Sequence, residues 1–116
     1  MYVDAYVMAV PRDALDRYFE IARNSAALWL KHGALSVTEC RGDDVPLGKL
    51  TSFPRAVMAT EDEVIVFSTV TYTDRTHRDA VNVLVAADPD MMTAMQDAPV
   101  DGARMIIGGF EVVVSA

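Results

Sequence analysis

The chain of 116 residues contains one cysteine, Cys40, and only 10 basic residues against 17 acidic ones. One cysteine excludes an intrachain disulfide framework. The formal net charge of −7 disfavours phosphate backbones and anionic lipid as partners, because like charges repel. No apolar run approaches the roughly 18 residues that span a bilayer, and no basic leader precedes an apolar segment at the N-terminus. We therefore expect a cytoplasmic protein that binds neither nucleic acid nor membrane.

Motifs for the common cofactors are also missing. His32 and His77 are the only histidines, and neither lies in an HxH or HExxH arrangement, so one protomer cannot build a multi-histidine metal site. Walker, GxGxxG, GxSxG and CxxC patterns are absent. We expect no metal, haem or other cofactor. The simplest role for His32 is to complement the C-terminus of a helix, and His77 is expected in the exposed first turn of another helix.

Hydrophobic residues make up 52% of the chain, which together with its length predicts a single domain over residues 1–116. Alternating and β-branched runs predict strands at 2–10, 35–41, 64–72 and 104–114. Pro11 and Gly33 bracket a helical apolar stripe from about 11 to 32. Asp74 caps a helix over 75–87, and Pro89 begins a short helix through 95. Residues 42–54 form a long connection rich in glycine and proline.

The order of these elements, βαββαβ, predicts a ferredoxin-like fold of class α+β, with a four-stranded antiparallel sheet and the helices on one face. Both faces of the first and last strands are apolar. In the first strand, Val3 and Val7 alternate with Tyr6 and Met8. Because the helices cover one face only, leaving the other wet would cost roughly 1.5–3 kcal/mol for each large side chain. We expect a homodimer whose two sheets pack face to face.

Several local strings carry a family resemblance over the whole chain. They are Val3-Asp4, Val10-Pro11, and the segments 32–35, 39–57, 66–68, 78–79, 88–91 and 101–110. On these strings the chain resembles the YbaA-like small bacterial proteins, a family of unknown function in the dimeric α/β-barrel superfamily. The resemblance implies a ferredoxin-like protomer whose sheet joins that of a partner in a dimeric α/β barrel. It implies no known reaction.

The segment from Glu39 to Arg55 is the most unusual part of the sequence. In a functional interpretation, Arg41, Lys49 and Arg55 bind a carboxylate or phosphate through charge-assisted hydrogen bonds. In the alternative, these charges cap turns and pair with one another. The neighbouring Asp43 and Asp44 are either an acid–base or cation-binding pair or two side chains that point apart.

Three further features have two interpretations each. Cys40 points away from Glu39 on its strand, and a buried inert thiol is more common there than a nucleophile. Gly108 and Gly109 either let a flat ligand approach the sheet or allow close packing within the protein. The methionines near 91–95 and 105 either cover a hydrophobic pocket or fill the core, and Trp29 is expected in the core.

The sequence thus leaves two functions open. The first is a homodimer that binds a small organic molecule, including an anionic one, or acts as an interaction module. The alternative is a small cofactor-independent enzyme, similar to a monooxygenase or isomerase, that acts on a hydrophobic or anionic substrate between sheet and helices. The candidate ligand-binding residues are Asp4, Tyr6, Glu39, Arg41, Arg55, Ser68, Arg78 and Arg104.

Overall fold

The computed structural model describes all 116 residues. Its elements are β1 (Tyr2–Pro11), a 3₁₀ turn η1 (Arg12–Ala14), α1 (Leu15–Lys31), β2 (Ser36–Arg41), α2 (Phe53–Ala56), β3 (Glu63–Tyr72), α3 (Arg75–Ala87), α4 (Pro89–Ala94) and β4 (Ile106–Glu111). The strands form one antiparallel sheet in the order β2-β3-β1-β4. This arrangement confirms the predicted ferredoxin-like fold. The sheet is open, with β2 and β4 at its edges, and the single chain does not close a barrel.

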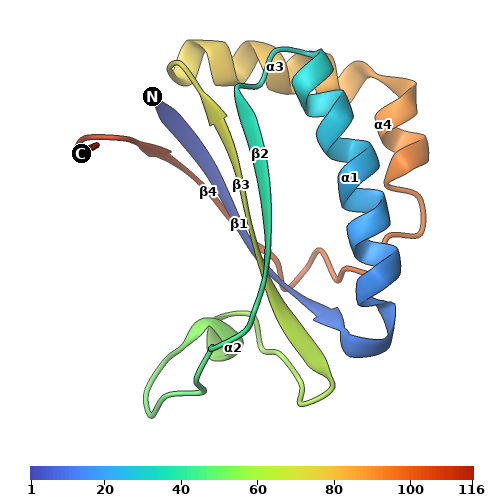
Figure 1. Ribbon diagram of the computed structural model, residues 1–116, viewed down its shortest axis with the longest axis vertical. Coiled ribbons are helices and arrows are strands. Elements are labelled where there is room, and N and C mark those ends of the chain that lie inside the picture. The colour runs from blue at the N-terminus through green and yellow to red at the C-terminus, as the bar shows by residue number, and fades with distance from the viewer.

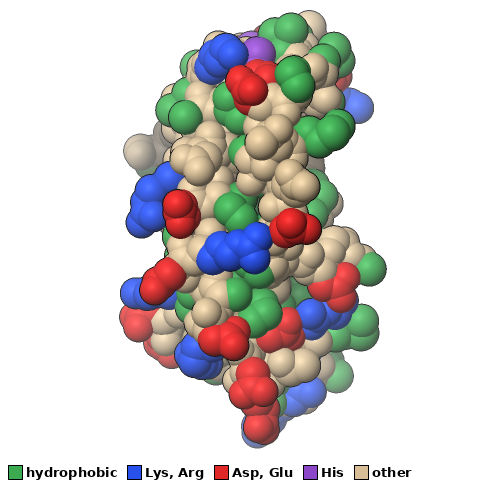
Figure 2. Space-filling view, turned by 90° about the vertical axis from the view of Figure 1, so that its right-hand side faces the viewer, with side chains coloured by type: hydrophobic (Ala, Val, Ile, Leu, Met, Phe, Trp, Pro, Cys, Tyr) green, Lys and Arg blue, Asp and Glu red, His purple; other side chains and the backbone are tan.

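The helices α1, α3 and α4 all lie on one face of the sheet (Figure 1). Their buried side is apolar, and the largest cluster joins Met8, Val10 and Val66 from the sheet to Leu15, Tyr18 and Ala22 from α1. The outer surface of this side carries charges of both signs interspersed among other side chains (Figure 2). That pattern is typical of a surface that faces water.

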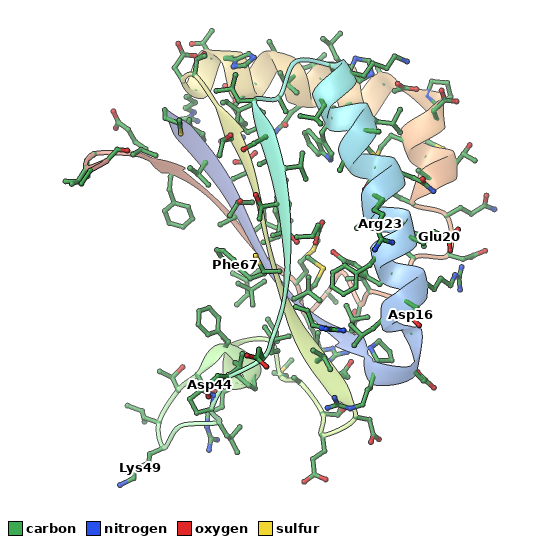
Figure 3. All side chains as sticks on the ribbon, viewed as in Figure 1. Asp16, Glu20, Arg23, Asp44, Lys49 and Phe67 are labelled. Atoms are coloured by element: carbon green, nitrogen blue, oxygen red, sulfur yellow. The ribbon has the colours of Figure 1, made fainter.

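Strand alternation decides which residues face the helices. Tyr6 pairs with Ser68, and Ser68 pairs with Glu39, so these three lie in one row across β1, β3 and β2 on the helix-facing side. The next row, on the opposite side, contains Cys40, Phe67, Val7 and Ile106. Figure 3 shows Phe67 on the side of the sheet away from α1. We call this second side the open face.

The connection between β2 and β3 covers one end of the open face (Figure 1). Val57, which is 1% exposed, packs there against Ala9 and Ile65. We expected a second copy of the chain to cover this face, and at this end the chain covers it with its own connection. The connection contains the short helix α2, which Ser52 caps by accepting a hydrogen bond from the backbone N–H of Arg55.

The predicted boundaries differ from the observed ones mainly at the ends of elements. The first helix begins with η1, and β4 ends at Glu111 rather than near residue 114. The helix predicted over 75–87 matches α3. None of the helices is long and apolar enough to cross a membrane.

Candidate functional site

A cavity of about 550 Å³ lies between the helix-facing side of the sheet and α1, α4 and the segment that leads to β4. Of its 19 lining residues, 14 are hydrophobic. The aromatic residues are Tyr6, Tyr18 and Trp29. Pockets that bind small organic molecules have this size and largely apolar lining, with a few polar groups that fix orientation.

The main polar group in the cavity is the half-buried carboxylate of Glu39. The Tyr18 hydroxyl donates a hydrogen bond of 2.9 Å to Glu39 Oε2. The Ser68 hydroxyl donates to the same oxygen. Both donors are buried, Ser68 at 4% exposure and Tyr18 at 5%. They fix the carboxylate through Oε2, so Oε1 is the oxygen available to a bound molecule.

The two tyrosines stay protonated over the physiological pH range. Burial, together with the negative charge of Asp4, raises the pKa of Tyr6 to about 12. Burial and the charge of Glu39 raise the pKa of Tyr18 even further. Each hydroxyl therefore acts as a hydrogen-bond donor rather than as a phenolate.

A second polar group lies outside the cavity, where β1 meets α3. Asp4 is 4% exposed, and its Oδ1 lies 3.6 Å from Nε of Arg78. The same guanidinium donates to the Tyr2 hydroxyl at 2.9 Å and lies 5.0 Å from the centre of the Tyr2 ring. Gly109 makes room for them, because a Cβ there would lie 2.3 Å from the Tyr2 hydroxyl. The glycine thus serves close packing within the chain rather than ligand approach.

Three predicted arginines do not line the cavity. Arg41 is exposed at the end of β2. Arg55 donates to the carbonyls of Leu47 and Gly48, at 2.9 and 3.2 Å, and so holds the β2–α2 loop. Arg104 binds the Glu63 carboxylate through both of its terminal nitrogens, at 2.8 and 2.7 Å. The alternative interpretation, in which the charges of the Glu39–Arg55 segment cap turns and pair with one another, describes Arg55. Arg104 lies outside that segment and pairs with Glu63.

The candidate residues therefore lie in separate parts of the structure. Tyr6, Glu39 and Ser68 come together in the cavity, and Asp4 and Arg78 form the neighbouring ion pair. Sequence reasoning missed Tyr18 as a functional residue because it belongs to the apolar stripe of α1. The sequence could have indicated this role, because Tyr18 lies one turn before Ala22 on the side of α1 that faces the sheet. Met91, Met95 and Met105 line the cavity as the covering residues that one interpretation expected, whereas Met92, which it also included, does not line the cavity and is 77% exposed.

The remaining singled-out residues have local roles or lie far from the cavity. His32 follows α1, and its Nε2 is 2.7 Å from Oδ2 of Asp88. This hydrogen bond holds the pKa of Asp88 below its usual range. His77 is half-buried rather than exposed, and its Nδ1 accepts from the backbone N–H of Thr73. No three His, Cys, Asp or Glu side chains come together in a group that could hold a metal ion.

Cys40 departs from expectation, because it is exposed on the open face rather than buried. Asp43 and Asp44 line a small hollow of about 190 Å³ beside the sheet, next to Phe53 and Phe67. Figure 3 shows Asp44 on the loop below the sheet, far from α1. These residues do not contribute to the larger cavity.

Comparisons with known proteins identify the family to which the chain belongs. The family model described as "Protein of unknown function (DUF1428)" matches residues 1–102. The uncharacterized protein YbaA of Escherichia coli strain K12 is 46% identical over 113 residues, which are 97% of each chain. The protein of the same name in Shigella flexneri has the same identity and coverage. The family resemblance noted in the sequence is confirmed.

Solved structures support the fold. A dimeric ferredoxin-like protein of unknown function from Jannaschia sp. CCS1 has a TM-score of 0.59 at 19% identity, covering 97% of this chain and 100% of that one. An uncharacterized NIPSNAP domain protein from Burkholderia xenovorans has a TM-score of 0.65 at 13% identity, covering 100% and 98%. A dimeric ferredoxin-like protein from an uncultured marine organism has a TM-score of 0.63 at 14% identity, covering 99% and 98%.

Proposed function

The chain belongs to the DUF1428 family, and from this premise we propose that it binds a small, mainly apolar organic molecule whose hydrogen-bond donor meets Glu39. One observation carries the proposal. A cavity of about 550 Å³ with a largely hydrophobic lining contains a carboxylate that two buried hydroxyls hold in place. Because the pocket is already formed, little binding free energy is lost to the ordering of side chains when a ligand enters.

The charge of the lining narrows the class of ligand. Glu39 and Asp97 are the only charged residues that line the cavity. A bound anion would face two carboxylates without a compensating cation, and burying such a charge is costly. The anionic ligand considered from the sequence depended on arginines that lie elsewhere. A neutral molecule with a hydroxyl or N–H group fits the cavity better.

Three bicyclic probes of similar size test this proposal: naphthalene, 1-naphthol and 1-naphthoic acid, titrated calorimetrically at neutral pH. A hydrogen bond to a charged group contributes about 1.5–3 kcal/mol. We therefore expect 1-naphthol to bind at least about tenfold more tightly than naphthalene, and ionised naphthoate to bind weakest. In Glu39→Gln the carboxylate charge is lost, so the penalty for naphthoate should shrink.

A pair of matched variants locates the binding site. Ala98 lines the cavity, whereas Ala27 is exposed on α1. Ala98→Leu should fill part of the cavity and weaken 1-naphthol binding, and Ala27→Leu should leave it unchanged. Equal effects of the two variants, or the same affinity for all three probes, would overturn the proposal.

We also propose that the protein acts as a homodimer joined through the open face. Phe67, Ile106 and Phe110 lie on this face, and they are 39%, 43% and 60% exposed in the single chain. A patch of exposed large apolar side chains on one face of a sheet is typical of a protein interface. Two of the structures with the same fold are described as dimeric, which supports a second copy as the partner.

A further inference from the structure

The polar row beneath α1 has the parts of a proton-transfer site. Glu39, Ser68 and Tyr6 are directly paired across three neighbouring strands, and all three line the cavity. Adjacent strands lie about 4.8 Å apart, so the backbones of Glu39 and Tyr6 are roughly 10 Å apart. A small ring system bridges that distance while resting over Ser68.

The carboxylate of Glu39 is positioned for chemistry as well as for binding. Tyr18 comes from α1 and Ser68 from β3, and both donate to Oε2. One oxygen is thereby held from two directions, and the second oxygen is left to meet the ligand in an apolar cavity. A base that is fixed before the substrate arrives loses less entropy in reaching the reactive geometry.

At the other end of the row, Tyr6 offers a neutral donor. Its pKa is raised to about 12, chiefly by burial. The hydroxyl therefore keeps its proton at neutral pH and can donate it to an oxygen that gains negative charge. Donors of this kind stabilise oxyanions most strongly where water is excluded.

We propose that Glu39 is a general base that removes a proton from the carbon next to a carbonyl group in the bound molecule. The C–H bond breaks and its proton moves to the Glu39 carboxylate. The electron pair forms the C=C bond of an enolate, whose oxygen accepts a hydrogen bond from Tyr6. When the proton on Glu39 is replaced by one from solvent before delivery to the same carbon, the hydrogen of that carbon is exchanged. Delivery to another carbon of a conjugated enolate isomerises the molecule.

This step is balanced without an oxidant or reductant, since one proton leaves a carbon and one proton comes back. The substrate class is an apolar ketone that can enolise. The inference rests on the proposed binding function, because the ketone must enter the same cavity. It adds a reaction to that function and assigns the roles of base and donor to Glu39 and Tyr6.

The bicyclic ketone 2-tetralone is a suitable probe. Loss of the proton signals next to its carbonyl would be followed by NMR in deuterated buffer, and its binding would be measured separately by calorimetry. We expect the protein to accelerate exchange above the buffer rate. General-base catalysis contributes about 10²–10⁴-fold, so Glu39→Gln should lower the rate by at least about 100-fold. Tyr6→Phe, which removes one oxyanion donor, should lower it by about 100-fold.

The controls separate chemistry from binding and folding. Glu111 is exposed on β4, so Glu111→Gln should exchange at the wild-type rate. The Glu39 and Tyr6 variants should still bind 2-tetralone with affinities close to wild type. Binding without accelerated exchange, or full exchange in Glu39→Gln, would overturn the inference and leave the binding function standing. Failure of 2-tetralone to bind would overturn this inference, while tight binding of 1-naphthol would leave the binding function standing.

Discussion

At the scale of single residues, Arg104 joins three segments. Besides Glu63, it binds Asp101 at 2.8 Å and the carbonyl of Met58 at 3.0 Å. The hydrogen bonds from Arg104, together with that from the backbone N–H of Thr60, lower the pKa of Glu63 from 4.5 to about 2. Since the folded state depresses this pKa, the stabilisation is present above about pH 4.5 and is lost as the pH falls towards 2.

We therefore predict that Glu63→Gln lowers the thermal unfolding midpoint by several degrees at neutral pH. The difference from wild type should narrow below about pH 4.5 and vanish near pH 2, where Glu63 becomes protonated. Thermal melts followed by circular dichroism, from neutral pH down to about pH 2, measure this difference between the two unfolding midpoints. Glu61→Gln serves as the control, because Glu61 is exposed two residues earlier. A difference that stayed constant with pH would show that the charge of Glu63 is not responsible.

The candidate site was predictable only in part at this scale. Alternation along a strand places Tyr6 and Ser68 on the side that faces the helices, because successive residues point to opposite faces. Arginines cannot be placed in this way. Arg55 and Arg104 reach carbonyls and carboxylates in loops, and the sequence reveals the type of such a side chain but not the partner it binds.

At the scale of elements, α3 depends on its N-terminal cap. Asp74 Oδ1 accepts a 2.7 Å hydrogen bond from the backbone N–H of His77. Loss of such a cap costs about 1 kcal/mol. We predict that Asp74→Ala lowers the free energy of unfolding by this amount, measured in urea with an unchanged dependence on denaturant. Asp74→Asn keeps the side-chain oxygen, so its free energy of unfolding should fall much less. Equal losses in the two variants would point to the charge instead of the cap.

Elements with a strong periodic pattern were predictable, and α2 was not. The helix over 75–87 combines an N-cap with a regular apolar stripe, so its start and end follow from local chemistry. The four residues of α2 are too few to show a helical period. Its place is decided by distant contacts, because Val57 packs on Ala9 and Ile65 from strands β1 and β3.

At the scale of the whole molecule, the two sides of the sheet have different roles. The helix-facing side forms one wall of the cavity, and the polar row with its Tyr18 contact needs three strands and α1 to come together. Such an arrangement depends on contacts between residues far apart in the chain. Local patterns therefore predicted the apolar character of both faces, whereas a pocket between sheet and helices was only one of two interpretations.

The exposed apolar residues of the open face predict a homodimer. Substitutions at two neighbouring residues of β4 test this prediction. Ile106 lies on the open face and Ile107 on the opposite one, at 43% and 58% exposure. A lysine inside an apolar interface loses its hydration without gaining a partner, which is costly. We predict that the wild-type protein sediments at twice 12.7 kDa at micromolar concentration, that Ile106→Lys is monomeric, and that Ile107→Lys remains dimeric. A wild-type monomer, or dissociation by both variants alike, would contradict assembly through the open face.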